Sequence, residues 1–152
     1  MLTPYAKKWI WRLVWLIVLI NLFVVCSHFT NDLKARFPDM DTSRMRFGIA
    51  SWYSETDPAI NERTANNEKF DDGADTCATW HFPFHEKLLV INGFNGKWVV
   101  CRVNDRGPAK RLKREIDLTK AAYRKIWTPK RGLIPVTVIP IEKPKTKKPA
   151  SR

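Results

Sequence analysis

Two short polar segments carry the carboxylates best placed to do chemistry. Residues 103–108 read VNDRGP, so an acidic and a basic side chain precede a Gly-Pro pair. Gly107 can take backbone angles closed to other residues and Pro108 fixes its own φ, which predicts a tight turn with both charges at its mouth. Residues 64–68 read TANNE and lie in a polar stretch. Two carboxylates on loops of a small domain are the minimum for general acid/base work on a sugar. The catalytic candidates are therefore Asp105 and Glu68.

The segments around these carboxylates read as short strands with one helix. Thr119 is placed to cap a short helix that reaches about residue 127. Residues 54–75 form a long polar loop, and loops of that length without structure of their own are usually functional or disordered. Apolar patterning predicts strands over residues 46–53, 87–91, 97–103 and 133–141. The pattern predicts a mainly β protein of six or so short strands. It is compatible with more than one type of small β-barrel fold.

The two ends of the 152-residue chain do not read as globular. Basic residues followed by an apolar run predict a signal peptide or membrane anchor, with the N-terminus cytoplasmic and the rest exported. Cleavage after Ser27 and retention of residues 9–26 as an anchor both stay open, with a slight preference for the anchor. The expected divisions are a signal or anchor at 1–27, a linker at 28–45, a folded domain at 46–142 and a basic disordered tail at 143–152.

The net charge of +12 raises the question of an anionic partner. A basic chain invites a nucleic-acid hypothesis, but export argues against it, so we expect no nucleic-acid partner. The basic tail is better explained as a solvated segment that aids solubility and weak adsorption to surfaces. We expect the membrane to be contacted through the N-terminal segment.

Export also places the cysteines in an oxidising compartment. Cys101 shares a strand face with Val99 and Val103, which predicts that it points into the core. A Cys77–Cys101 disulfide and two buried thiols are about equally good interpretations, because the sequence does not supply the geometry. His81 and His85 lack an obvious third ligand, so we expect no metal and no cofactor.

Five motifs follow one another in a recognisable order. They are GIASWY at 48–53, TANNEKFD at 64–71, FPF at 82–84, VNDRGP at 103–108 and IDLT at 116–119. Over about residues 47–141 the chain resembles the rare lipoprotein A (RlpA) type of double-psi β-barrel, a lytic transglycosylase family that acts on bacterial peptidoglycan. The resemblance implies a small six-stranded double-psi β-barrel with one or two short helices, preceded by the apolar signal or anchor helix.

The resemblance also implies a reaction and its residues. Glycan strands, with a preference for those lacking stem peptides, would be cleaved to 1,6-anhydro-N-acetylmuramic acid ends, with Asp105 as acid/base and Glu68 assisting. An adjacent arginine lowers the pKa of an aspartate, so this role requires Arg106 to point away from Asp105. A tight ion pair between them would make Asp105 structural. The expected substrate-binding residues are Arg106, Trp52, Tyr53, Asn66, Thr64 and Thr79, and the expected structural residues are Gly107, Pro108 and Asp117.

Two departures from the family pattern bear on activity. Thr79 stands where the family has a histidine, and Asn67 replaces a glycine, although asparagine tolerates the left-handed region. The missing histidine keeps a second interpretation open, an expansin-like module that binds and loosens cell-wall polysaccharide without cutting it. Either protein would lie in the periplasm or cell envelope, secreted or anchored by residues 9–26.

Overall fold

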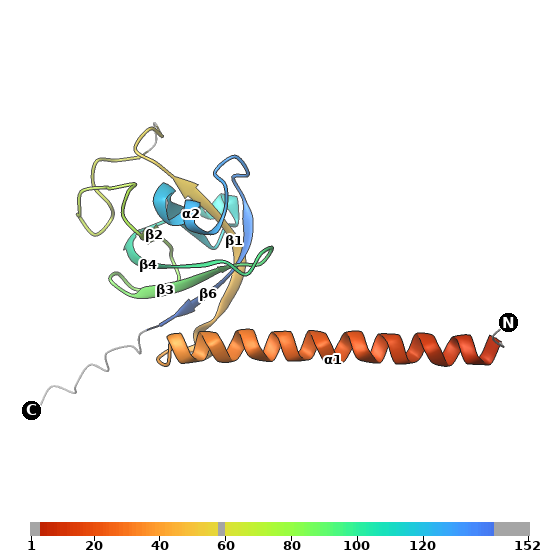
Figure 1. Ribbon diagram of the computed structural model, residues 1–152. Helices are drawn as coiled ribbons and strands as arrows, with labels where there is room; N and C mark the ends of the chain where they lie inside the picture. The colour runs from red at the N-terminus through yellow and green to blue at the C-terminus, as the bar shows by residue number, and fades with distance from the viewer. Residues whose placement is uncertain (1–3, 58–59, 142–152) are drawn as a thin grey trace, which may run out of the picture. The chain divides into compact units, whose positions relative to one another are not determined.

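A computed structural model describes residues 4–57 and 60–141 of the chain (Figure 1). The chain divides into two compact units, residues 1–38 and residues 39–152, which are described separately. The predicted disordered tail at 143–152 lies outside the described residues.

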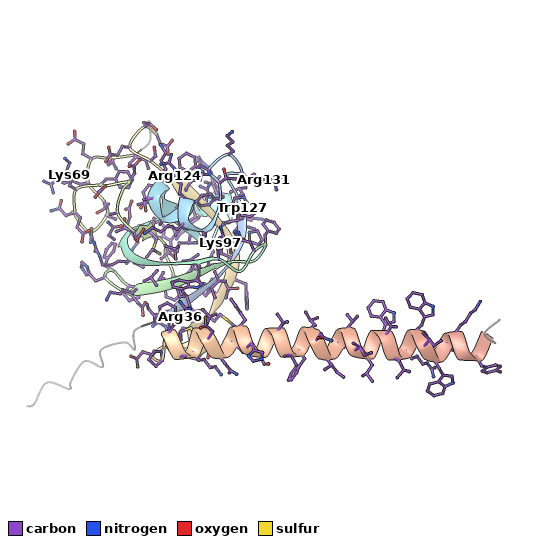
Figure 2. All side chains as sticks on the ribbon, in the orientation of Figure 1. Arg36, Lys69, Lys97, Arg124, Trp127 and Arg131 are labelled. Carbon is purple, nitrogen blue, oxygen red and sulfur yellow. A yellow bond between two sulfur atoms is a disulfide. The ribbon has the colours of Figure 1, made fainter. Side chains whose placement is uncertain are left out.

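The first unit is built on a single long helix, α1, Pro4–Arg36. Apolar side chains project along its length (Figure 2), and residues 7–36 are long and apolar enough to cross a membrane. Its polar side chains bond within the helix, as when Asn21 Nδ2 donates to the Ile17 carbonyl at 2.8 Å. The helix continues into residues 28–36, which were predicted to belong to a linker, and an Asp32–Arg36 ion pair at 3.0 Å joins two side chains of its last turn. The helix ends at Arg36, shortly before Pro38. A proline disfavours the helical conformation in the residue that precedes it, which accounts for this end.

The second unit is a closed six-stranded barrel with the strand order β1-β5-β2-β4-β3-β6. Parallel pairs join β1 to β5 and β2 to β4, and the other pairs are antiparallel. Short 3-10 turns occupy Thr42–Arg44 and Lys110–Leu112. The strands are β1 (Arg46–Tyr53), β2 (Thr76–Ala78), β3 (Lys87–Asn92), β4 (Trp98–Asp105), β5 (Ile116–Thr119) and β6 (Ile134–Pro140), and helix α2 is Lys120–Ile126.

Alternation along the strands builds the core. In β4 the side chains of Val99, Cys101 and Val103 are buried, as the sequence predicted, while those between them are partly exposed. Helix α2 adds its inner face to the same cluster through Ala122, Tyr123 and Ile126. The prediction of a mainly β, six-stranded barrel with short helices is confirmed.

One local prediction was wrong. Thr119 takes the N-cap position of α2, but its side chain does not cap the helix. Its Oγ1 instead donates to the carbonyls of Ala74 and Thr76, at 2.5 and 3.2 Å. The hydroxyl therefore joins the end of β5 to the start of β2.

Candidate functional site

Four side chains form one row across neighbouring strands of the barrel. Ser51 of β1 pairs with Asp117 of β5, Asp117 pairs with Ala78 of β2, and Ala78 pairs with Asp105 of β4. Residues that pair in register project from the same side of a sheet. Two strand spacings separate the backbones of the two aspartates by about 10 Å. The structure thus places the carboxyl groups of Asp117 and Asp105 on either side of the Ala78 methyl group.

A register shift puts Asp105 in this row. Cys77 pairs with Val103, but the next residue, Ala78, pairs with Asp105, so Asn104 is an extra residue on β4. Val103 is fully buried, and strict alternation would turn Asp105 toward the same interior. The shift turns the carboxyl out of the core, which is how bulges commonly re-aim a side chain beside a functional site.

The loop at residues 64–68 holds the Asp105 carboxyl in place. The Ala65 amide donates to Asp105 Oδ1 at 2.8 Å, and the Arg106 amide donates to the same oxygen at 2.8 Å. The loop is anchored to β4 by the Asn66 amide, which donates to the Asn104 carbonyl at 3.2 Å. Asn67 has a positive φ of 71°. This is the left-handed conformation that we expected asparagine to tolerate in place of glycine.

Glu68 is fixed by an ion pair. Its two carboxylate oxygens accept hydrogen bonds from Arg102 Nη1 and Nη2 at 2.7 and 2.8 Å. The side chains of Asn66 and Asn104 donate to it as well, at 2.8 and 3.2 Å. The hydrogen bonds from Arg102, followed by those from the two asparagines, lower the pKa of Glu68 to about 2. Glu68 is therefore a permanent anion near neutral pH and has no proton to give.

The Arg106 side chain turns away from Asp105. Its Nη1 donates to the carbonyls of Thr79 and Phe82 at 2.8 and 2.9 Å. Its guanidinium lies 3.7 Å from the centroid of the Phe84 ring. This is the orientation that an acid/base role for Asp105 requires. The Arg106 guanidinium is therefore already bonded within the protein, although Arg106 was predicted to bind substrate.

Asp117 and Tyr53 form the buried half of the site. Ser51 Oγ donates to Asp117 Oδ1, and Arg114 Nε lies 3.5 Å from the same oxygen. Burial raises the pKa of Asp117, with a smaller contribution from the charge of Asp105, while Ser51 and Arg114 act in the opposite direction. Burial, and then the charges of Asp105 and Asp117, raises the pKa of Tyr53. Its hydroxyl is buried with no hydrogen-bond partner among the described residues.

The other predicted substrate-binding residues differ in how accessible they are to a ligand. Thr64 is buried and its hydroxyl donates to Asn66 Oδ1 at 2.6 Å, so both serve the loop. Thr79 is fully buried and donates to the Glu115 carbonyl, so it is not accessible to a ligand in this arrangement. Trp52 is partly buried against the main core, and its Nε1 donates to the Pro129 carbonyl at 3.2 Å. Among the predicted residues, Asp105, Thr64 and Arg106 border open space.

That open space is a cavity of about 380 Å³ beside the loop at residues 64–68. Gly107 faces the interior of the site, where an added Cβ would lie 3.3 Å from Ala78 Cβ and 3.8 Å from Asp117 Oδ2. No cluster of three potential metal ligands occurs within residues 4–57 and 60–141. The lining of the cavity includes Ile60, Arg63, Thr64, Ala65, Phe70 and Asp105.

A disulfide joins Cys77 of β2 to Cys101 of β4, with their Cα atoms 5.9 Å apart. It is the pairing that the sequence left open against two free thiols. Cys77 directly precedes Ala78, so the bond ties the two strands together beside the register shift. The site is thereby held between a covalent link on one side and the Asp105–Ala65 hydrogen bond on the other.

Sequence reasoning missed one feature of the site and left a second open. Asp117 was treated as structural support, yet its place in the row with Asp105 makes it part of the site; an acidic residue within a strand otherwise made of Ile, Leu and Thr was the available signal. From the sequence, Trp80 could line a saccharide groove or belong to the barrel core; half of it is exposed, and its Nε1 donates to the Pro108 carbonyl at 2.8 Å.

Comparisons with known proteins agree with this architecture. The sequence profile of a family described as "Lytic transglycolase" matches residues 46–138. A "Probable endolytic peptidoglycan transglycosylase RlpA" from Nostoc sp. is 38% identical over 107 residues, which is 68% of this chain and 29% of that protein. An "Endolytic peptidoglycan transglycosylase RlpA" from Pseudomonas aeruginosa is 38% identical over 106 residues, covering 69% of this chain and 30% of that protein. One from Vibrio cholerae is 37% identical over 107 residues, covering 69% and 40%.

The chain thus spans less than half the length of these relatives. Among solved structures, the Streptomyces papain inhibitor is similar with a TM-score of 0.51 and 20% identity, over 64% of this chain and 94% of that one. At that identity the likeness concerns the barrel fold alone.

Proposed function

The chain belongs to the lytic transglycolase family, and from that membership we propose that its barrel cleaves the glycan strands of peptidoglycan to leave 1,6-anhydro-N-acetylmuramic acid ends. The relatives named as endolytic peptidoglycan transglycosylases supply the substrate class. The observation that carries the proposal is the Asp105 carboxyl, fixed by two backbone amides at the edge of a cavity with the Arg106 guanidinium turned away.

The proposed reaction uses one carboxyl twice. Asp105 gives its proton to the glycosidic oxygen as the bond from that oxygen to C1 of the muramic acid breaks. The C6 hydroxyl of the same sugar then bonds to C1 and returns its proton to Asp105, so no water is consumed. Asp105 is a reasonable carrier because its Oδ1 is held by two N–H groups and the carboxyl keeps one orientation through both steps.

Glu68 is given a positioning role in this scheme. Its carboxylate is paired with Arg102 and does not line the cavity of about 380 Å³, so it acts through the loop that it holds. It also holds Asn66, whose amide anchors the loop that orients Asp105. Replacing Glu68 is therefore expected to lower activity less than replacing Asp105.

We place the barrel outside the cytoplasm, with α1 as its membrane anchor. Basic residues precede the apolar part of α1, which favours a cytoplasmic N-terminus. The Cys77–Cys101 disulfide suits an oxidising compartment such as the periplasm.

One observation favours a second function, polysaccharide binding without cleavage. Thr79 occupies the position of the family's histidine, and its buried hydroxyl cannot replace an imidazole as an acid or base. A binding module has no need of that histidine, whereas an enzyme must work without it.

The test is to incubate the full-length protein, in mild detergent, with glycan strands stripped of stem peptides and to analyse the products by mass spectrometry. We expect anhydromuramyl ends from the wild type, a loss of at least about 100-fold in Asp105→Asn, and a smaller loss in Glu68→Gln. Intact strands that co-sediment equally with wild type and Asp105→Asn would instead establish the binding module.

A further inference from the structure

A turn and a loop that are distant in the sequence meet at one end of the barrel. The turn at residues 93–97 joins β3 to β4, and the loop at residues 127–133 follows α2. The rings of Phe94 and Trp127 lie 5.8 Å apart, centroid to centroid. Asn95 Nδ2 also donates to the carbonyl of the last residue of α2, at 3.1 Å. The two segments therefore form one continuous surface.

This surface carries positive charge that no acidic residue balances. Neither residues 93–97 nor residues 124–133 contain an aspartate or a glutamate. Lys125 is paired with Asp75, but the four other cations of these segments are exposed and form no ion pair with a residue that the structure describes. We call the cations and the two rings beside them the basic-aromatic surface, part of which is labelled in Figure 2: Phe94, Lys97, Arg124, Trp127, Lys130 and Arg131.

Exposed apolar side chains adjoin these cations. Phe94 is 65% exposed and Leu133 is 57% exposed. The Arg131 guanidinium lies 5.9 Å from the centroid of the Trp127 ring, so positive charge and aromatic surface are in contact. A hollow of about 400 Å³ extends the apolar area beside the turn, and most of its lining residues are apolar, among them Phe47, Ile49, Pro135 and Val136.

Cations around exposed apolar side chains are typical of a protein face that lies on a membrane. The cations are attracted to anionic headgroups, while aromatic and leucine side chains enter the boundary between headgroups and acyl chains. A soluble polyanion would pair with the cations and leave Phe94 and Leu133 in water. The apolar side chains therefore favour a bilayer over a soluble polyanion as the partner.

The rest of the chain keeps the barrel near such a bilayer. Residues 37–45 separate α1 from β1, and even fully extended they reach at most about 30 Å. With α1 in the membrane, as proposed above, the barrel meets the lipid surface at a high effective concentration. A weak attraction is then sufficient to dock it.

We propose that the basic-aromatic surface docks the barrel on a bilayer that contains anionic phospholipid. The inference rests on the placement of α1 proposed above, and it concerns a different part of the barrel from the cleavage site, because none of these residues lines the cavity at Asp105. Strand β4 leads from the turn at residues 93–97 to Asp105, and its eight residues span roughly 25 Å. Docking therefore holds the Asp105 carboxyl away from the lipid, on the side from which glycan approaches.

The test measures how close the surface comes to lipid in the full-length protein. The protein is reconstituted into vesicles of phosphatidylcholine, or of equal parts phosphatidylcholine and phosphatidylglycerol, with the same small share of a lipid whose headgroup carries a nitroxide quencher. In a Cys26→Ser background, which removes the free cysteine, a fluorophore is attached at Thr128→Cys or at Ala109→Cys. Thr128 is exposed in the loop of the surface, and Ala109 is exposed beyond the far end of β4.

Two variants with equal loss of charge separate this surface from the general basicity of the barrel. The site variant is K97Q/R124Q/K130Q/R131Q. The control variant is K69Q/K110Q/R111Q/K113Q, which removes four exposed cations from other parts of the barrel. These four also lack an ion pair with any residue that the structure describes.

We expect the Thr128 label to be quenched at least about threefold more in the mixed vesicles than in phosphatidylcholine, because four cations face the anionic headgroups. The Ala109 label should be quenched about equally in the two. The site variant should remove the difference at Thr128 and the control variant should keep it, while F94A should reduce it to about half. Equal quenching at Thr128 in both lipids, the same loss in both variants, or an unchanged difference in F94A would overturn the inference.

The outcome is separable from those of the earlier proposals. Cleavage is assayed in detergent, without a bilayer, so a failure there leaves the quenching comparison unaffected. If the protein does not float with phosphatidylcholine vesicles, the placement of α1 fails. Flotation with the mixed vesicles that is lost in the site variant but kept in the control variant would then still support the surface, and absence of such flotation would overturn it.

Discussion

At the scale of single residues, the pKa of Glu68 is set chiefly by its contact with Arg102. The hydrogen bonds from Arg102 bring the pKa of Glu68 from an ordinary 4.5 down to about 2 in the folded protein. A depressed folded-state pKa means that Glu68 stabilises the fold fully above about pH 4.5, and that this contribution is lost as the pH falls toward about 2. We expect the thermal midpoint of the wild type to fall more steeply across that window than the midpoint of Glu68→Gln.

Calorimetry from pH 6 to pH 2 checks this expectation. Glu55→Gln is the matched control, because Glu55 is an exposed glutamate of the same polar loop. Its midpoint should track the wild type throughout. A Glu68→Gln curve parallel to the wild type would show that the ion pair does not stabilise the fold.

Tyr53 offers a second test at this scale. Its hydroxyl is buried and has no hydrogen-bond partner within residues 4–57 and 60–141, whereas the hydroxyl of Tyr123 donates to the Arg131 carbonyl at 2.8 Å. An unsatisfied buried hydroxyl costs free energy, so Tyr53→Phe should leave the free energy of unfolding unchanged or raise it by up to about 1 kcal/mol. Tyr123→Phe should lower it by about 0.5–1.5 kcal/mol. Urea unfolding of both variants compares them, and a larger loss in Tyr53→Phe would contradict the assignment.

At the scale of elements, the disulfide between β2 and β4 is expected to be a large contributor to stability. It closes a loop with a sequence separation of 24, for which the chain-entropy estimate is roughly 3–4 kcal/mol. C77S/C101S should lower the free energy of unfolding by about that amount, measured with guanidinium. Cys26→Ser, which removes the free cysteine of α1, should leave the barrel transition where it is. An unshifted transition in C77S/C101S would mean that the strands are held by their other contacts.

The strands also show which elements could be predicted from the sequence. Strands β1 and β4 are eight residues each, long enough for alternation to be visible, and both were predicted. Strands β2 and β5 have three and four residues, too few for a period to stand out, and they carry Ala78 and Asp117. The register shift at Asn104 depends on how two strands pair, so one strand's own pattern could not reveal it.

The candidate site was predictable to a similar degree. Its two acidic segments were predicted from motifs, because the conformation and chemistry of a short loop depend mainly on the order of its own residues. The direction of Arg106 was not, since it depends on the carbonyls of Thr79 and Phe82, which lie 27 and 24 residues away in the chain. The ion pair of Glu68 with Arg102 likewise joins groups separated by 34 residues.

At the scale of the whole molecule, the barrel has its own closed hydrogen-bonding and its own core. We therefore expect a fragment that begins at Asp39 to fold without α1, form the disulfide and unfold at the same temperature as the barrel of the full chain. Circular dichroism and thiol counting on the fragment check this. A fragment that is molten or remains reduced would show that α1 is needed for the barrel to form.

The length of α1 has a consequence for where the barrel works. Its 33 residues make a rod of about 50 Å, against about 30 Å of hydrocarbon in a bilayer. With α1 in the membrane and the proposed activity in the barrel, the barrel would be a tethered catalyst whose encounters depend on effective concentration near the surface. Glycan within reach of the tether would then be attacked repeatedly, and glycan beyond it would not, so the tether would set the depth of wall that is remodelled.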